Sequence, residues 1–126
     1  MKNLTAEAYD LAVSFLTTQG RPLDQALLAY HFDSGSVDAI LDALAEYQNP
    51  DGGFGKGLEP DIQMPGSSAR TTTFGLEALT DVKASADHPV VRSAIAYLLD
   101  TFDASSQVWT IVPSEVDDMP HAPWWD

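Results

Sequence analysis

Carboxyl groups cluster near the C-terminal end of the sequence. Glu115, Asp117 and Asp118 lie within four residues of one another, and His121 follows three residues later. Closely spaced carboxylates repel one another, so one of them can retain a proton and act as a general acid. We interpret these four residues as candidate catalytic residues. The alternative is a solvated acidic loop, because such patterns arise readily in a chain with 19 acidic residues.

A second set of charged residues lies in and just after a segment rich in glycine and proline. Glu59 and Asp61 flank a proline, and Arg70 follows downstream. Carboxylates accept hydrogen bonds from hydroxyl groups and coordinate cations, so Glu59, Asp61 and Arg70 are candidate substrate-binding residues. The alternative is that one carboxylate forms an ion pair with Lys56 or Arg70 and holds the segment in place.

Three tryptophans offer aromatic walls for a ligand. Trp124 and Trp125 are adjacent in a segment stiffened by proline, close to His121. Tryptophan rings can line pockets for carbohydrates, isoprenoids or cationic ligands, so Trp109, Trp124 and Trp125 are candidate substrate-binding residues. The alternative is that Trp124 and Trp125 pack on a further repeat.

The sequence contains no recognisable metal or cofactor motif. It has no cysteine, and its three histidines, at positions 31, 88 and 121, do not pair at helical spacing. We therefore expect no metal site. Lys56 follows several glycines but lacks the spacing of a P-loop, so nucleotide binding is not indicated and the cofactor stays unidentified.

Charge and length limit the partners. The 126 residues are enough for one domain with a core, and the formal net charge of −13 repels nucleic acid and anionic lipid surfaces. The N-terminus does not read as a secretory signal, and no apolar run approaches the ~18 residues of a membrane span. We expect a cytoplasmic protein whose partner is a small molecule or a second copy of the chain.

Five helices are predicted to position these residues. Apolar spacing, caps and breakers place them at 5–20, 22–33, 36–48, 68–82 and 87–102. The fifth has a broad apolar face that includes Ile95 and Leu99 and is suited to burial. Gly75 inside the fourth helix costs about 1 kcal/mol relative to alanine, which predicts close packing against a neighbour.

The connecting segments are irregular. Residues 49–68 contain three prolines and five glycines, and a loop of this length is often functional. Residues 103–126 are predicted to be irregular as well, with 108–112 as a short extended piece. The prolines in that segment argue against a further helix.

The end of the third predicted helix has the most informative spacing in the chain. Gln48 is followed at fixed intervals by Gly52 and Phe54, with an Asp-Gly turn at Asp51. This pattern resembles the Gln-x3-Gly-x-Trp/Phe repeat motif of terpene cyclases and protein prenyltransferase β subunits, which are α/α toroids. In that family the glutamine amide bridges backbone groups at helix ends. Here we expect it to satisfy a carbonyl at the end of the third helix.

A degenerate second copy of the motif follows. A shift of 55 residues superposes Phe54 on Trp109, together with the helix end that precedes each of them. Under the same shift Gln48 falls on Asp103. The segment from Val37 to Trp109 therefore resembles one and a half repeats of such a toroid.

The resemblance implies an all-α fold of antiparallel helical hairpins. With about five helices it would be a partial α/α toroid, a single domain at 1–126 with its hairpins in 5–102 and an irregular segment at 103–126. A closed toroid needs more hairpins, so we expect a truncated toroid. Its uncovered hairpin face predicts self-association.

The function remains open between two classes. The resemblance implies an enzyme, or a fragment of one, that acts on an isoprenoid or carbohydrate-like substrate. In that case the acidic cluster resembles the Asp-x-Asp-Asp motif of protonation-initiated cyclases, with Asp117 as the proton donor. The alternative is a non-catalytic helical repeat domain that mediates protein interaction, since this fold serves several chemistries.

Overall fold

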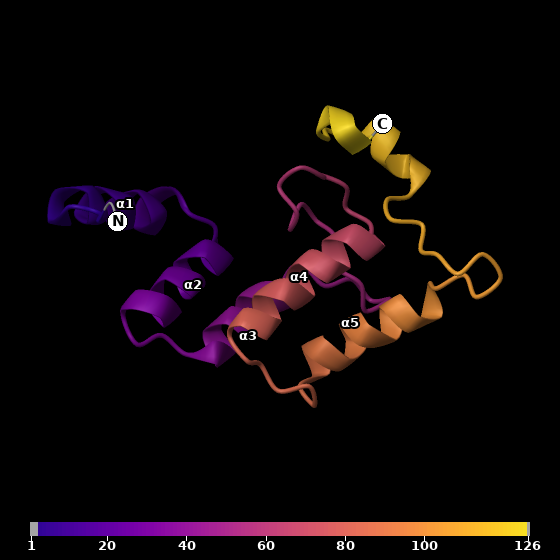
Figure 1. Cartoon of the computed structure of the whole chain (residues 1–126), viewed down its shortest axis with the longest axis horizontal. Coiled ribbons are helices and arrows are strands. Elements are labelled where there is room, and N and C mark those ends of the chain that lie inside the picture. The colour runs from indigo at the N-terminus through magenta and orange to yellow at the C-terminus, as the bar shows by residue number, and fades with distance from the viewer. Residues whose placement is uncertain (1–2, 126) are drawn as a thin grey trace. The chain divides into compact units, whose positions relative to one another are not determined.

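The computed structural model describes residues 3–125, and in this range the protein is all-helical (Figure 1). The predicted all-α fold is therefore confirmed. The elements are α1 (Ala6–Gln19), α2 (Pro22–Phe32), α3 (Val37–Ala45), α4 (Ala69–Asp81), α5 (Pro89–Asp100) and the short 3-10 helices η1 (Ser114–Asp118) and η2 (Pro123–Trp125). The described residues contain three isolated β-bridges and no β-strand.

Local sequence explains where the helices begin. The Thr5 hydroxyl accepts a hydrogen bond from the Ala8 amide at 3.2 Å, and the Ser68 hydroxyl accepts one from the Thr71 amide at 3.0 Å. Each bond satisfies an amide that the first helical turn leaves without a partner. α2 and α5 begin with proline, whose fixed φ and missing N–H suit the first position of a helix.

The chain divides into two compact units, Met1–Ala43 and Leu44–Asp126, with the division inside α3. In the first unit, α1 packs on α2, and the rings of Tyr9 and Phe32 meet edge to face with 5.9 Å between centroids. An Arg21–Asp24 ion pair at 3.0 Å caps α2, and its hydrogen bond to the Asp24 carboxylate lowers the pKa of that group.

The second unit is built around the hairpin of α4 and α5, which lie side by side and run antiparallel (Figure 1). Phe54 from the preceding loop is fully buried beneath α4. A Cβ atom on Gly75 would lie 2.7 Å from the Phe54 ring, so only glycine admits the ring at this point. The predicted close packing at Gly75 is thus confirmed.

The turn after α3 rests against α5. Gly52 has a φ of 90°, and a Cβ there would lie 2.5 Å from the Ser93 carbonyl oxygen. This combination of positive φ and close backbone approach requires glycine. The Asp51 carboxylate accepts hydrogen bonds from the Gly53 amide at 3.0 Å and the Ser67 hydroxyl at 2.8 Å, which confirms its role in the turn.

Gln48 has different partners from those expected. Its amide donates to the carbonyl oxygens of Gly52 and Val90, both at 2.9 Å, and so ties the turn to the first turn of α5. The end of α3 is served instead by Lys56, whose ammonium donates to the carbonyl oxygens of Glu46 and Gln48 at 2.9 and 3.0 Å. A cation suits this position because the carbonyls at a helix C-terminus carry partial negative charge.

The 55-residue repeat has a structural counterpart. α3 and α5 end 55 residues apart, and each is followed by a turn closed by one antiparallel bridge, Gln48 to Phe54 in the first copy and Asp103 to Val108 in the second. The two copies differ in burial, because Phe54 is enclosed whereas Trp109 is 42% exposed.

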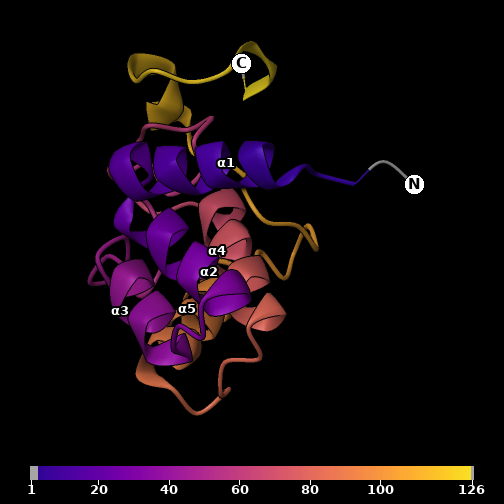
Figure 2. The same cartoon turned by 90° about the vertical axis from the view of Figure 1, so that its left-hand side faces the viewer.

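The C-terminal segment is irregular, as predicted, apart from two corrections. Residues 108–112 form no strand, and the proline-containing stretch holds the two short 3-10 helices η1 and η2. Both fit the sequence, because proline is tolerated before or at the first position of a helical turn. Both views show the segment beside the 58–66 loop, near the N-terminal end of α4 (Figures 1 and 2).

Candidate functional site

Two of the predicted site segments meet through their backbones. Ile62 and His121 form an antiparallel bridge, the Gln63 amide donates to the Pro120 carbonyl at 3.0 Å, and the Ala122 amide donates to the carbonyl of residue 61, also at 3.0 Å. The half-buried residues Asp61 and His121 therefore lie in adjacent segments of the backbone. The His121 Nδ1 atom lies 2.7 Å from the Met119 carbonyl oxygen.

A small hydrophobic cluster holds this junction together. Ile62, Met64 and Val116 are buried there, and Val112 and Trp125 pack against them. Trp125 is thus a packing residue of the junction rather than an open wall. Its neighbour Trp124 is 68% exposed, so the adjacent tryptophans do not form one common surface.

Glu59 and Arg70 form an ion pair. The Arg70 Nη2 atom lies 2.8 Å from Glu59 Oε2, and the Glu59 side chain is almost completely buried. The guanidinium also lies over the Phe74 ring, 5.9 Å from its centroid. The structure therefore shows the ion-pair alternative for Glu59. Arg70 compensates the charge of Glu59, and the pair ties the long loop to α4.

Three buried polar atoms in residues 3–125 lack a hydrogen bond, and all belong to predicted site residues: Glu59 Oε2, Arg70 Nε and Trp125 Nε1. The Glu59 oxygen is close to the guanidinium, but the two lack the alignment of a hydrogen bond. Buried polar side-chain atoms are nearly always satisfied, so Glu59 and Arg70 near the start of α4 and Trp125 at the junction each retain hydrogen-bonding capacity.

The acidic cluster lies apart from that buried carboxylate. Glu115, Asp117 and Asp118 belong to η1, and all three are exposed on either side of the buried Val116. Glu115 borders an open cavity of about 420 Å³ beside Met119. All three carboxylates face solvent, so they do not form an enclosed acidic site.

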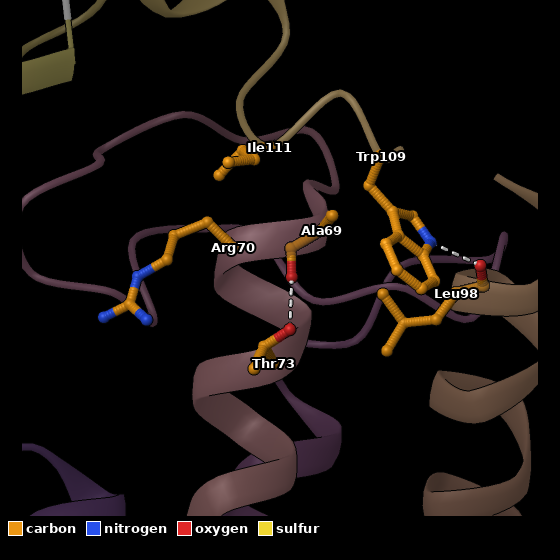
Figure 3. A pocket seen from close by; sticks show the side chains of 6 residues that line it. All are labelled: Ala69, Arg70, Thr73, Leu98, Trp109 and Ile111. Carbon is orange, nitrogen blue, oxygen red and sulfur yellow. Dashed lines mark hydrogen bonds between the residues drawn. The ribbon is translucent and has the colours of Figure 1, made fainter. Parts of the chain in front are cut away.

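A mainly apolar cavity lies between α4, α5 and the segment that follows α5 (Figure 3). It has a volume of about 270 Å³ and is lined by Ala69, Arg70, Thr73, Leu98, Trp109 and Ile111. The Arg70 amide donates to the Ile111 carbonyl at 3.0 Å, which fixes that segment across the end of α4. The Arg70 guanidinium points away from Trp109, so the cavity between them is bordered by apolar side chains (Figure 3).

The side chains of Trp109 and Thr73 in the cavity wall are satisfied internally, which leaves Arg70 Nε as the wall atom without a hydrogen bond. The Trp109 indole donates to the Leu98 carbonyl at 2.7 Å, and the Thr73 hydroxyl donates to the Ala69 carbonyl at 2.9 Å. The Trp109 ring also packs on Phe102 with 4.6 Å between centroids. The cavity wall therefore offers few free hydrogen-bonding groups to a ligand.

The turn before Trp109 is held by an ionised carboxylate. Asp103 accepts hydrogen bonds from the hydroxyls and amides of Ser105 and Ser106. These bonds, the Ser106 hydroxyl first, hold the pKa of Asp103 well below its usual range. The turn that presents Trp109 is thus stabilised by a group that stays charged at neutral pH.

Large apolar side chains of α5 and of the segment that follows it are exposed, among them the cavity residues Trp109 and Ile111. The predicted burial of Ile95 and Leu99 is wrong: they are 43% and 69% exposed, because α5 is covered only along its Val90, Val91 and Ala94 edge. Phe102, Val108, Trp109 and Ile111 are also exposed. Large apolar side chains that gather around a cavity are typical of an interaction site.

No protein family, curated protein sequence or solved structure matches this chain. The toroid resemblance therefore rests on the Gln48 motif. None of the helices in residues 3–125 combines the length and apolar character needed to cross a membrane. In the same range no three histidine or carboxylate side chains group closely enough to hold a metal ion.

The structure places the predicted site residues in three locations. Arg70 and Trp109 share the apolar cavity, with Glu59 paired to Arg70; Asp61, His121 and Trp125 lie at the junction; and the acidic cluster lies in η1 with Trp124 exposed beyond it. Sequence reasoning missed Leu98 and Ile111 as cavity residues. The helical spacing of Val91, Ile95 and Leu98 was the available signal, but it was interpreted as a buried face.

Proposed function

We propose that the Leu44–Asp126 unit is a non-catalytic binding module of the helical repeat type, which takes up an apolar group of a protein partner in the Trp109 cavity. The observation that carries this proposal is the exposed apolar surface around that cavity. Trp109 and Ile111 line the cavity and are 42% and 58% exposed, and Leu99 and Val108, next in sequence to the lining residues Leu98 and Trp109, are each more than half exposed. A buried apolar anchor surrounded by weaker contacts is the usual source of affinity in protein interfaces.

The wall chemistry supports an apolar group over a sugar. Sugar recognition needs several free donors and acceptors, whereas the Trp109 indole and the Thr73 hydroxyl already bond to backbone carbonyls. At about 270 Å³ the cavity is slightly smaller than ligand sites, which begin at about 300 Å³. One large side chain matches this size better than an extended substrate.

The same chemistry supports a second candidate, an isoprenoid-binding domain of toroid type. Its apolar lining favours a hydrocarbon chain, and Arg70 at the border offers a cation, although Glu59 already compensates that charge. This candidate requires an acid for chemistry, and the exposed Asp117 and Asp118 offer weak support for that role. Self-association through the same surface is a further variant of the binding function.

Nuclear magnetic resonance on the full chain tests the proposal. The Trp109 indole N–H is a direct reporter, identified by its loss in a Trp109→Phe variant. Indole and leucine amide should shift this signal, whereas glucose should not. A Trp109→Ala variant lacks this signal, so the backbone amides of the lining residues Thr73 and Ile111 report on it, and they should no longer shift with indole. Trp124→Ala, at an exposed ring, is the matched control. Unchanged spectra with indole would refute the binding function of the cavity.

The isoprenoid candidate is tested in the same experiment with geranyl diphosphate. Saturable binding of this probe together with its conversion to product, lost in an Asp117→Asn variant, would establish the enzyme and displace our proposal. Binding without conversion would leave a non-catalytic site whose ligand is an isoprenoid rather than a protein side chain.

A further inference from the structure

A second cavity lies further along the α4–α5 hairpin. Its volume is about 300 Å³, and its lining comes from the C-terminal half of α4, the N-terminal half of α5 and the loop between them. Leu76 and Thr80 contribute from α4, and Val91 and Ile95 contribute from α5. The hairpin therefore has one cavity towards each end.

Helical register places the two cavities on the same side of the hairpin. Ala69 and Thr73 line the first cavity, and Leu76 and Thr80 line the second, so the four residues recur at spacings of four, three and four along one stripe of α4. On α5, residues 91, 95 and 98 form the matching stripe. Residues three and four apart share a helix face, so the two cavities lie in line between the helices, and we refer to them together as the α4–α5 groove.

The distance between the cavities follows from the helix rise. Thr73 and Thr80 are seven residues apart on α4, and Val91 and Leu98 are seven residues apart on α5. Seven residues of helix advance about 10 Å, or two turns. A helix lying in the groove would thus present side chains at i and i+7 to the two cavities, which is the pattern of helix-in-groove recognition.

The charge around the groove selects a cationic occupant. The hairpin and the turn that follows it carry five carboxylates, at Glu77, Asp81, Asp87, Asp100 and Asp103. The hairpin's own cations are fewer, and one of them, Arg70, is paired with Glu59. A second copy of the chain would bring the same net charge of −13 and would be repelled, whereas a basic segment would be attracted.

We propose that the α4–α5 groove binds a cationic amphipathic helix of a partner protein, with apolar anchors at i and i+7 in the two cavities. This inference rests on the proposed binding function and specifies its partner. The anchors supply affinity through burial, and basic residues beside them face the carboxylates of the hairpin.

Designed peptides test the register. The probe is a helical peptide of about 18 residues, or five turns, with leucines at i and i+7 and lysines on the flanking faces. Its affinity for the full chain is measured by calorimetry. We expect it to bind about tenfold tighter than a peptide of the same composition with leucines at i and i+5, which point to different sides. A version with glutamates in place of the lysines should bind at least tenfold more weakly.

Matched variants locate the site. Thr73 and Thr80 are both exposed, and each donates its hydroxyl to the carbonyl four residues earlier, so Thr73→Trp and Thr80→Trp fill one cavity each with little effect on folding. Either should weaken the i, i+7 peptide about tenfold. Thr18→Trp on α1 is the control, because Thr18 is exposed and makes the same kind of hydrogen bond.

The outcomes separate the two proposals. If indole binds at Trp109 but the two leucine spacings give equal affinities, the groove inference is wrong and the binding function stands. If neither indole nor any peptide binds, both fail. Equal binding of the glutamate peptide would refute the cationic partner. A dimer in sedimentation experiments that Thr73→Trp dissociates would identify a second copy as the occupant and overturn the inference.

Discussion

Replacing Gly75 with alanine tests the packing of the hairpin directly. In an exposed helix this change stabilises, because alanine has the higher helix propensity by about 1 kcal/mol. At Gly75 the added Cβ would lie 2.7 and 2.8 Å from two carbon atoms of the Phe54 ring and 3.2 Å from a methyl of Leu58. These distances are shorter than van der Waals contact, so a neighbour must move.

The magnitude follows from how little Phe54 can move. Its ring has no exposed surface, and its amide is fixed by a 3.0 Å hydrogen bond to the Thr72 hydroxyl. Overpacking of a well-filled core costs about 1–3 kcal/mol. After the propensity gain is subtracted, Gly75→Ala should lower the free energy of unfolding by up to about 2 kcal/mol.

Urea denaturation followed by circular dichroism measures this change. In a Phe54→Leu background the smaller side chain leaves room for the Cβ, so Gly75→Ala should there raise the free energy of unfolding by up to about 1 kcal/mol. Glu77→Ala, at an exposed position of the same helix, should change stability by less than about 0.5 kcal/mol. A stabilising effect of Gly75→Ala in the otherwise unchanged protein would show that this contact does not exist in solution.

Three further perturbations probe the polar contacts. Gln48→Ala removes the amide that bonds to the carbonyl of Val90, so urea denaturation should show a loss of about 1–3 kcal/mol; an unchanged midpoint would contradict the tie. Arg70→Met leaves the buried Glu59 carboxylate without its cation and should lower the free energy of unfolding by about 3 kcal/mol. Adding Glu59→Gln to this variant should restore part of the lost stability. An unchanged stability in Arg70→Met would contradict the ion pair. The pKa of Asp103 is lowered in the folded state, so its contribution to stability is present above the unfolded pKa of about 3.9 and is lost as the pH falls through the folded value. The difference in unfolding free energy between the parent and Asp103→Asn should therefore be constant near neutral pH and should shrink in acid. A difference that grows in acid would contradict the assignment.

The helices were predictable because their signals are local. Thr5 and Ser68 accept from amides three residues away, and the prolines at positions 22 and 89 need only their own geometry. The glycine at position 75 also predicted close packing, since an unfavourable residue inside a helix needs a compensating contact. Spacing alone was sufficient for these elements.

The partners of polar side chains were less predictable because they depend on contacts distant in sequence. The Gln48 amide was expected to serve its own helix, yet it reaches Val90, 42 residues away. The sequence suggested a nearby carboxylate as the partner of Lys56, whereas the fold of the loop brings its ammonium to the carbonyl oxygens of Glu46 and Gln48. The fate of Glu59 was foreseen as one of two alternatives, and the ion pair with Arg70 is the one observed.

The candidate site differed most from expectation where one helix face was assigned to burial. An apolar stripe predicts that a face is covered, but it does not say whether the cover comes from the same chain. On α5 the Val90 and Ala94 edge is buried, while Ile95 and Leu99 remain exposed. For the acidic cluster in η1, the spacing of the carboxylates in the sequence does not predict whether they are buried or exposed, and in the structure they are exposed.

The exposed groove is a consequence of the motif formed by Gln48, Gly52 and Phe54. Gln48 and Gly52 hold α5 at Val90 and Ser93, while Phe54 holds α4 at Gly75. Each helix is thereby fixed through one face, and the adjoining faces form the two cavities. A motif that serves only to pack one repeat on the next therefore also determines which apolar residues remain available to a partner. For this reason the Gln48 and Gly75 variants should lower stability through the contacts beneath the helices, whereas Thr73→Trp should weaken peptide binding with stability unchanged.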